Sequence, residues 1–380
     1  MRRDADAVIV GAGVAGSAIA TALASRGWDV VLLDKDRFPR HKACGEFLSP
    51  EAQSSLREFG LLDAVRELAP SVMTHVRLHT EHGLSLEVPL PGEAWGVSRY
   101  SLDATLQRSA AERGARVYES CPVTGVTATS AGYRVDCEPD REPMSFHSRI
   151  VIGAGGRRSL EAKRIPKASV QGRTFVGVKA HYESSSPCMP VVDLFFFRGG
   201  YVGISPVEDG RLNVAALVGG VAFRKHAGAS AIEQIVERAI ETVPAIKQRM
   251  AGGALISGTQ AATFPVVIRP SPRAWSDYPL VGDAAAVIPP FCGDGMAMAL
   301  RSAELCAPMA DAYMHGDITE GQWRDRYTSL LKEQFTGALR WGSVLDRLLM
   351  NPTLASALLR IGAHAPWLAE RVVRATRLDR

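Results

Sequence analysis

The sequence lacks an apolar run long enough to cross a bilayer. Its 46% hydrophobic and 22% charged residues are typical of a soluble globular protein. A cleavable signal segment is also missing, because the first four residues lead directly into a strand-like run. We therefore expect a cytoplasmic protein. The 380 residues leave room for two or three domains of ordinary size.

Cysteine is scarce, and the six copies show no paired spacing such as C-x-x-C. The nine histidines are scattered, so no metal site is predicted. In a cytoplasmic chain the cysteines are most simply free thiols. They are Cys44, Cys121, Cys137, Cys188, Cys292 and Cys306.

A large excess of charge of either sign is also absent, since the formal net charge is only +4. The excess gathers in the tail, where residues 360–380 hold five Arg against Glu370 and Asp379. A solvated helix face explains this most simply, and contact with a membrane surface or a carrier protein is the alternative. Nothing resembles a nucleic-acid-binding motif, so no nucleic acid is expected as a partner.

What the sequence does contain is a glycine loop between a strand and a helix. Residues 7–10 read as a buried strand, and a helix follows to about residue 26. Gly11 allows the tight turn, Gly13 lets backbone approach a pyrophosphate, and Gly16 lets the helix lie close to the strand. A second strand ends at Asp34, where an acid fits a hydrogen bond to an adenosine ribose. The stretch predicts a dinucleotide site.

Two later stretches repeat the theme of a strand running into glycines. Residues 150–156 are one, and residues 280–286 are the other, with a Gly-Asp pair. The second stretch continues through two prolines into a helix from about Gly295 to Met314. The free amides at that helix start offer positive potential to a ligand.

Local signals predict further elements along the chain. Ser49 and Pro50 start a helix, His82-Gly83 turns a hairpin over 75–90, and Ser101 caps a helix ending near Gly114. Strands are expected at 116–118, 124–129, 134–137, 175–178, 192–197, 201–204 and 212–218. Helices are expected at 230–250, with a break at Pro244, and from about residue 320 onward. Phe195 and Phe197 share a face of their strand and, with Tyr201, are candidates for a substrate wall, although core packing is the commoner role.

Taken together, the glycine stretches resemble the flavoprotein monooxygenase superfamily that includes p-hydroxybenzoate hydroxylase. They are Gly11-x-Gly13-x-x-Gly16, residues 153–159, and Gly282-Asp283 with its proline-glycine continuation. The segment 42–46 and the pattern at 99–106 point to the branch with geranylgeranyl reductases, to which flavin-dependent halogenases are related. The resemblance implies an α/β fold: a Rossmann-type, glutathione reductase-like FAD-binding domain, a β-sheet substrate domain and a C-terminal helical region. It implies FAD-binding segments at 1–70, 95–165 and 271–330, substrate-domain segments at 71–94 and 166–270, and C-terminal helices at 331–380.

The same resemblance implies roles for individual residues toward FAD. The first loop holds the pyrophosphate, Asp34 the adenosine ribose, and the helix start near Gly295 the pyrimidine edge of the flavin. The implied cofactor-binding residues are Gly11, Gly13, Ala15, Gly16, Asp34, Lys35, Arg40, Cys44, Gly45, Arg99, Val123, Ala154, Gly155, Gly282, Asp283, Pro290, Gly293, Gly295 and Met296.

Two departures from the family pattern bear on the reaction. Gly155 stands where hydroxylases usually have an Asp that helps bind both FAD and NAD(P)H, which speaks against direct reduction by a nicotinamide. The expected electron donor is NAD(P)H, acting either directly or through a partner flavin reductase. The halogenase signature Trp-x-Trp-x-Ile-Pro is absent from 200–206, which disfavours halogenation.

Three functions are compatible with these features. The first hypothesis is an FAD-dependent monooxygenase acting with O2, through a flavin C4a-hydroperoxide, on a lipophilic or aromatic small molecule. The second is a reductase of isoprenoid-like double bonds, with Cys44 or Cys292 as a candidate proton donor. The third is a non-catalytic FAD-binding protein.

Overall fold

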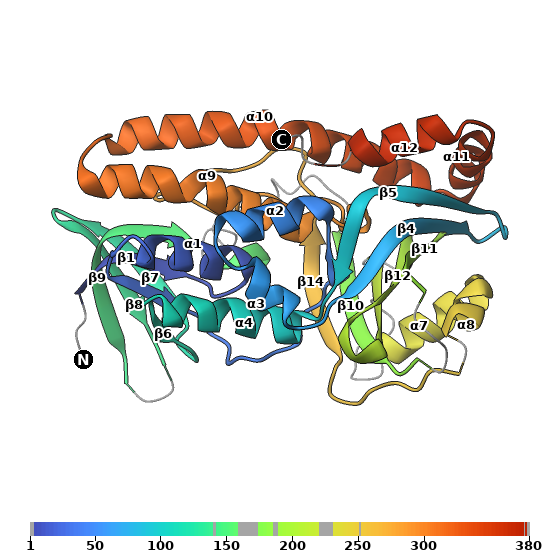
Figure 1. Cartoon of the computed structure of the whole chain (residues 1–380), viewed down its shortest axis with the longest axis horizontal. Coiled ribbons are helices and arrows are strands. Elements are labelled where there is room, and N and C mark those ends of the chain that lie inside the picture. The colour runs from blue at the N-terminus through green and yellow to red at the C-terminus, as the bar shows by residue number, and fades with distance from the viewer. Residues whose placement is uncertain are drawn as a thin grey trace.

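The computed structural model describes residues 4–139, 142–158, 174–184, 189–219, 231–250, 252–375 and 377, with side chains from residue 234 onward in the fifth range. Ser159 of the middle motif and Cys188 lie outside these ranges. Two sheets lie side by side along the long axis, and long C-terminal helices run across both of them (Figure 1). The expected α/β fold is confirmed.

The first sheet is built on the N-terminal strand. Its strands are β1 (Asp4–Val10), β2 (Val30–Leu33), β6 (Arg116–Tyr118), β7 (Val123–Thr129), β8 (Gly132–Cys137) and β9 (Met144–Gly153), in the order β6-β2-β1-β9-β8-β7. β1 pairs in parallel with β2 on one side and with β9 on the other. The chain continues from β1 to β2 on one side and later returns to β9 on the other, so the strand order reverses at β1. At such a point a crevice for a ligand opens at the carboxyl end of the strand.

Helices cover the first sheet. They are α1 (Val14–Ala24), α2 (Pro50–Glu58), α3 (Leu62–Arg66), α4 (Arg99–Glu112) and α9 (Gly295–His315). Every residue of α1 is buried, which explains its small, apolar composition. The cap of α4 is Ser98 rather than the predicted Ser101, because the Ser98 hydroxyl accepts the Ser101 amide.

The second sheet has eight strands. They are β3 (Phe47–Leu48), β4 (Ser71–Thr80), β5 (Ser85–Gly96), β10 (Thr174–Tyr182), β11 (Val191–Phe197), β12 (Gly200–Pro206), β13 (Leu212–Gly219) and β14 (Ala261–Val267). Both faces are buried. One face lies under α7 (Ala231–Thr242) and α8 (Ala245–Met250), and the other under C-terminal helices.

The C-terminal helices are α10 (Glu320–Leu349), α11 (Pro352–His364) and α12 (Pro366–Ala375). α10 runs without a break through residue 331, where the C-terminal region was expected to begin. Figure 1 shows α11 and α12 above the hairpin of β4 and β5. No helix in the described part of the chain combines the length and apolar character that crossing a bilayer requires.

The strand predicted at the start of the 280–286 stretch, before Gly282, is reduced to a single parallel bridge between Leu280 and Gly153. The chain then turns into the 3-10 helix η4 (Gly282–Ala284), because Gly282 has a φ of +63° that a strand does not permit. A second 3-10 turn, η5 (Pro290–Cys292), precedes α9. η4 follows the bridge to the end of β9, whereas Phe291 of η5 packs against Phe196 and Tyr201 of the second sheet.

Candidate active site

The loop after β1 closes on the second glycine turn of the first sheet. Gly11 has a φ of +111°, and a Cβ atom there would lie 2.4 Å from the carbonyl oxygen of Ala154. A Cβ atom at Gly16 would lie 1.8 Å from the carbonyl oxygen of Gly11. No side chain fits at such distances, so both positions require glycine. The backbone that follows β1 and the backbone that follows β9 therefore touch at the carboxyl end of the sheet.

Asp34 lies at the carboxyl end of β2 and is buried. Its Oδ2 accepts a hydrogen bond from the amide of Ala12 at 2.7 Å, and its Oδ1 accepts the amide of Asp36 at 2.9 Å. Arg40 Nη2 lies 3.8 Å from Asp34 Oδ2, and Arg40 Nη1 lies 3.7 Å from Asp103 Oδ2. These contacts fix the carboxylate beside the glycine loop.

Two further cations face the same loop. The buried Arg99 binds Asp103 with two hydrogen bonds of 2.6 and 2.8 Å. Burial alone lowers the pKa of Arg99, but the charge of Asp103 outweighs it and raises the pKa. For Lys42, burial and the nearby Arg99 charge lower the pKa to about 8. An anion bound here would relieve the repulsion between these cations.

These residues line one cleft. Its walls include nine of the residues singled out from the sequence: Gly11, Gly13, Asp34, Lys35, Arg40, Val123, Ala154, Gly155 and Asp283. Arg157 closes one side, with Nε 3.4 Å from Asp283 Oδ2. The cleft thus joins three stretches that lie far apart in the sequence.

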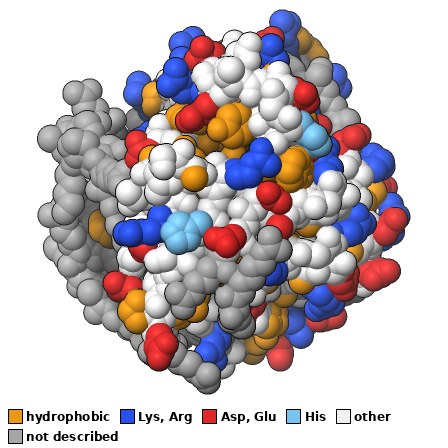
Figure 2. All heavy atoms as spheres, turned by 90° about the vertical axis from the view of Figure 1, so that its left-hand side faces the viewer, with side chains coloured by type: hydrophobic (Ala, Val, Ile, Leu, Met, Phe, Trp, Pro, Cys, Tyr) orange, Lys and Arg blue, Asp and Glu red, His pale blue; other side chains and the backbone are white. Residues whose placement is uncertain are grey.

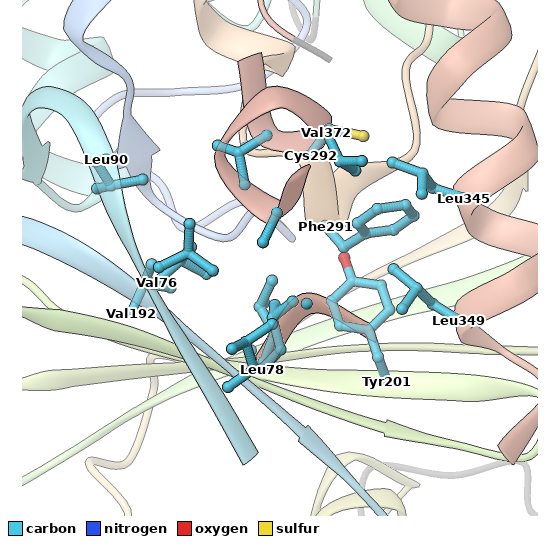
Figure 3. Close-up of a pocket in the computed structure, with 18 of the residues that line it drawn as sticks. Val76, Leu78, Leu90, Val192, Tyr201, Phe291, Cys292, Leu345, Leu349 and Val372 are labelled. Atoms are coloured by element: carbon cyan, nitrogen blue, oxygen red, sulfur yellow. The ribbon is translucent and has the colours of Figure 1, made fainter. Parts of the chain in front are cut away.

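A second hollow, the apolar pocket, lies between the second sheet and the C-terminal helices. Figure 3 shows side chains from β4, β5, β11, α10 and α12 directed into a common space. Tyr201 and Phe291 pack edge to face, with ring centroids 6.0 Å apart. The other side chains labelled around this space are Val76, Leu78, Leu90, Val192, Cys292, Leu345, Leu349 and Val372.

The cleft and the apolar pocket adjoin along one segment of chain. His41, Lys42 and Ala43 line the cleft, whereas Gly45 and Phe47 line the apolar pocket. A ligand that extends along the cleft past Lys42 therefore reaches the end of the apolar pocket formed by Pro290, Phe291, Cys292 and Gly293. This is the place where a reactive group and an apolar substrate can meet.

The comparison with known protein families decides what the cleft is for. The family described as "FAD binding domain" matches residues 4–317. The chain belongs to this family. FAD is therefore its cofactor, and the protein is an oxidoreductase of the flavoprotein class.

Relatives of this FAD-binding protein carry out several reactions. It is 29% identical over 375 residues to the menaquinone reductase of Mycolicibacterium smegmatis, covering 93% of this chain and 86% of the relative. It is 28% identical over 353 residues to digeranylgeranylglycerophospholipid reductase 1 of Methanothermobacter thermautotrophicus, covering 88% and 84%. A flavin-dependent halogenase of Armillaria mellea is 23% identical over 364 residues, covering 86% and 69%.

Solved structures share the fold. The myxobacterial chondrochloren halogenase superposes with a TM-score of 0.79 at 21% identity, covering 91% of this chain and 83% of that one. A geranylgeranyl bacteriochlorophyll reductase-like protein from Thermoplasma acidophilum superposes with a TM-score of 0.75 at 22% identity, covering 93% and 90%. The predicted family is confirmed.

The cleft fits FAD on its own geometry. A Cβ atom at Gly13 would approach the Arg99 guanidinium to 3.7 Å, so glycine leaves room for phosphate oxygens beside that cation. Lys42 makes no ion pair within the described residues, which leaves its ammonium available to a phosphate. Asp34 would meet a ribose hydroxyl, and Asp283 would meet the ribityl side of the cofactor.

The first turn of α9 follows directly after the residues 290–293 that form one end of the apolar pocket. Gly295 is the first residue of the helix, after the buried Asp294 and the left-handed Gly293. A Cβ atom at Gly293 would lie 2.9 Å from the Phe47 ring, so this turn also requires glycine. Burial raises the pKa of Asp294 to about 6, although its partner Arg377 at 2.5 Å opposes the shift.

Some predicted residues lie behind these walls instead of lining them. Ala15 and Met296 are buried in the core, and the amide of Gly282 donates to Ser302 Oγ at 2.8 Å. The Cys44 sulfur accepts from the Glu46 amide at 3.4 Å, and Asn213 Nδ2 donates to the Cys44 carbonyl oxygen at 3.1 Å. These residues shape the loops that make the cleft.

Phe195 and Phe197 take the commoner of the two expected roles, core packing, and do not line the apolar pocket. Phe195 is completely buried in the core under α7, stacked on His79 at 4.4 Å. Phe197 packs on the same core. The apolar pocket is on the other face of β11, where Leu194 lines it together with Tyr201, the third predicted residue. Both faces of β11 are buried, so alternation along the strand does not distinguish them.

Sequence reasoning also missed a buried ionic cluster beside Cys44. Glu46 Oε1 accepts from Lys179 Nζ at 2.9 Å and from the amide of Arg99 at 3.0 Å, while Glu46 Oε2 lies 2.5 Å from His181 Nε2. Lys179 Nζ lies 3.2 Å from His41 Nδ1. Burial raises the pKa of Glu46, but the His181 hydrogen bond and the Lys179 charge outweigh it and hold the pKa low. This Glu46 cluster ties the 41–47 segment to β10.

Proposed function

We propose that this protein reduces a carbon–carbon double bond in a lipid that carries an isoprenoid-like chain. The observation that carries the proposal is the apolar pocket, whose walls are dominated by Leu, Val and Ile. Branched aliphatic walls suit a flexible aliphatic chain, because they bury its surface without requiring hydrogen bonds. The pocket ends at the cofactor cleft, so a double bond at that end lies within reach of the cofactor.

The names of two relatives support the same substrate class. Menaquinone and digeranylgeranylglycerophospholipid both carry polyprenyl chains, and the enzymes named for their reduction match this chain over most of its length. The halogenase of Armillaria mellea is matched over 69% of its length, against 86% and 84% for these two reductases. Reduction of an isoprenoid-like chain therefore agrees with both the pocket and the relatives.

Reduced FAD would supply a hydride, and the reaction then needs one proton from the protein or solvent. Burial raises the pKa values of Tyr201 and Cys292, so both groups keep their protons. If either group gave up its proton, the resulting phenolate or thiolate would be left among apolar side chains. We infer that Cys44 is the proton donor, because it stands in the chain between Ala43, which lines the cleft, and Gly45, which lines the apolar pocket.

The product of a single turnover tests the proposal. Purified protein loaded with FAD is reduced with one equivalent of dithionite under anaerobic conditions. It is then mixed with detergent-dispersed digeranylgeranylglycerophospholipid, which has no quinone ring, so that its chains hold the only double bonds open to reduction. The proposal predicts a product that is heavier by two hydrogens. Conversion that occurs only in air, with an oxygen atom gained from labelled O2, would refute it.

A cysteine pair tests the proton donor. Cys44→Ser should slow product formation at least about tenfold while leaving flavin reduction by dithionite unchanged, because serine is a far weaker acid. Cys292→Ser is the matched control and should have a small effect. An equal loss in both variants would remove Cys44 from this role.

Monooxygenation is the second candidate function. One observation favours it: apart from Arg377 at its edge, the apolar pocket presents no strongly charged side chain, which suits a reaction that depends on exclusion of water. The electron donor is part of both proposals. We propose NAD(P)H, used directly or through a flavin reductase, and anaerobic bleaching of the flavin by NADPH alone distinguishes the two routes.

A further inference from the structure

Large exposed apolar side chains are concentrated on the C-terminal helices. Of nine such side chains among the described residues, five lie on α10, α11 and α12. Trp367, in the first turn of α12, is 65% exposed and is the most exposed of the nine. The other four are Trp341, Val344, Leu354 and Ile361. Exposure to water alone does not explain why large apolar side chains are concentrated on these helices.

The same helices carry unpaired positive charge. Five exposed arginines, none in an ion pair with a described residue, are interspersed with the apolar side chains: Arg340, Arg347, Arg360, Arg371 and Arg374. Among the described residues from 340 to 375 no acidic side chain is fully exposed, since Asp346 is buried and Glu370 is half-buried. This combination of basic and apolar side chains is typical of a surface that binds anionic lipid.

The opposite end of the molecule differs. Figure 2 shows acidic and basic side chains mixed over the face formed by the left-hand side of Figure 1. On β8, at that end, Arg134 and Asp136 form an ion pair with N and O atoms 3.1 Å apart. The uncompensated positive charge of the C-terminal helices is therefore a local feature.

These helices also cover the apolar pocket. Ile361 is 52% exposed and lines the pocket, so the interior apolar surface continues to the outside at α11. Leu358 on α11 and Leu368 and Val372 on α12 line the pocket from the same side. A lipid chain leaving a bilayer in contact with the outer side of these helices would pass from one apolar environment to another without crossing water.

We propose that α11, α12 and the end of α10 form a surface that docks on an anionic membrane. The docking surface is defined by the five exposed apolar residues and five arginines named above. Its role in passing a lipid substrate into the apolar pocket rests on the proposed function, whereas membrane binding itself does not. The aromatic ring of Trp367 would enter the interface, and the arginines would contact lipid phosphates.

Vesicle binding tests the docking surface directly. The full-length FAD-loaded protein is sedimented with vesicles of phosphatidylglycerol or of phosphatidylcholine. We expect binding to the anionic vesicles that weakens as salt is raised, because screening shortens the range of the arginine charges. Equal binding to both lipids, or none to either, would overturn the proposal, and in the second case an acidic protein partner would remain for this surface.

Two variants locate the contact. Arg371→Gln with Arg374→Gln should weaken binding about 25-fold, at about fivefold for each arginine near an anionic surface. The matched control is Arg324→Gln with Arg326→Gln, which removes the same charge from the other end of α10 and should leave binding within about twofold. An equal loss in both pairs would show that net charge, and not this surface, governs binding.

Trp367→Ala should weaken binding about tenfold, since a largely exposed indole loses its burial in the interface. Phe264→Ala, on β14 and 52% exposed, is its control and should have no effect. Turnover separates the two proposals. Binding to vesicles without reduction of any polyprenyl lipid contradicts the proposed function alone, and reduction of detergent-dispersed lipid without vesicle binding contradicts the docking surface alone.

Discussion

Replacing Glu46 by Gln tests the buried cluster that fixes the segment between the cofactor cleft and the apolar pocket. The Glu46 and Lys179 side chains are completely buried, with 2.9 Å between Oε1 and Nζ. His181 is 2% exposed and contacts the other carboxylate oxygen. Loss of the carboxylate charge leaves the Lys179 ammonium buried without a counter-charge.

The expected loss of stability is large because the Glu46–Lys179 pair is shielded from water. Removing one partner of a buried ion pair costs about 3–5 kcal/mol of unfolding free energy. With an unfolding entropy of about 2.1 cal/mol/K per residue, this lowers the melting temperature by about 4–6 °C in a chain of this length. Burial already lowers the pKa of Lys179, so the folded variant binds fewer protons than the unfolded chain. The loss is therefore greatest at low pH and shrinks as the pH rises toward the ordinary pKa of lysine.

Calorimetry from pH 6 to pH 9, within the range where the lysine shift acts, measures this effect. The exposed pair of Asp63 and Arg66 has a similar contact of 2.7 Å, and Asp63→Asn should cost less than about 1 kcal/mol. A double variant with Glu46→Gln and Lys179→Met should recover much of the loss. A Glu46→Gln protein as stable as the wild type at all pH values would refute the reasoning.

Three further predictions concern the cofactor, the pocket and the C-terminus. Gly16→Ala should abolish FAD retention through purification, because the new methyl group collides with the Gly11 carbonyl oxygen; full flavin content would contradict the assigned cleft. Leu358→Trp should reduce turnover of long-chain substrates more than of short ones, whereas Leu354→Trp, one turn earlier and outside the pocket lining, should spare both. Asp294 loses its charge as the pH falls through about 6, so the Arg377 contact should weaken below that pH; amide hydrogen exchange of α12, corrected for intrinsic rate, should rise there, and Asp294→Asn should remove the pH dependence.

Elements set by local signals could be predicted from the sequence. Ser49 and Pro50 begin α2 as expected, and the glycine-proline segment before Gly295 marks the start of α9. The cap of α4 was misassigned by one turn, because Ser98 and Ser101 both have the residue type of a cap and only the helix hydrogen bonds separate them. Local chemistry therefore fixes the type of an element better than its ends.

The parts of the site that depend on distant contacts could not be predicted. Lys179 and Glu46 are 133 residues apart, and Arg377 and Asp294 are 83 apart, with no local pattern to link either pair. The ligand-facing side of β11 could not be predicted because both of its faces are apolar and buried, so a period of two carries no information about which face meets a ligand. The family motifs identified the FAD cleft, whereas the apolar pocket emerged only from the packing of the C-terminal helices.

A single anaerobic turnover followed by flavin absorbance tests the central claim most directly. Reduced FAD-loaded protein is mixed with a polyprenyl lipid that has no quinone ring in a stopped-flow instrument, without oxygen and without any other oxidant. The account predicts that the flavin is reoxidised at the rate at which the lipid gains two hydrogens. A flavin that stays reduced until oxygen is admitted would contradict it.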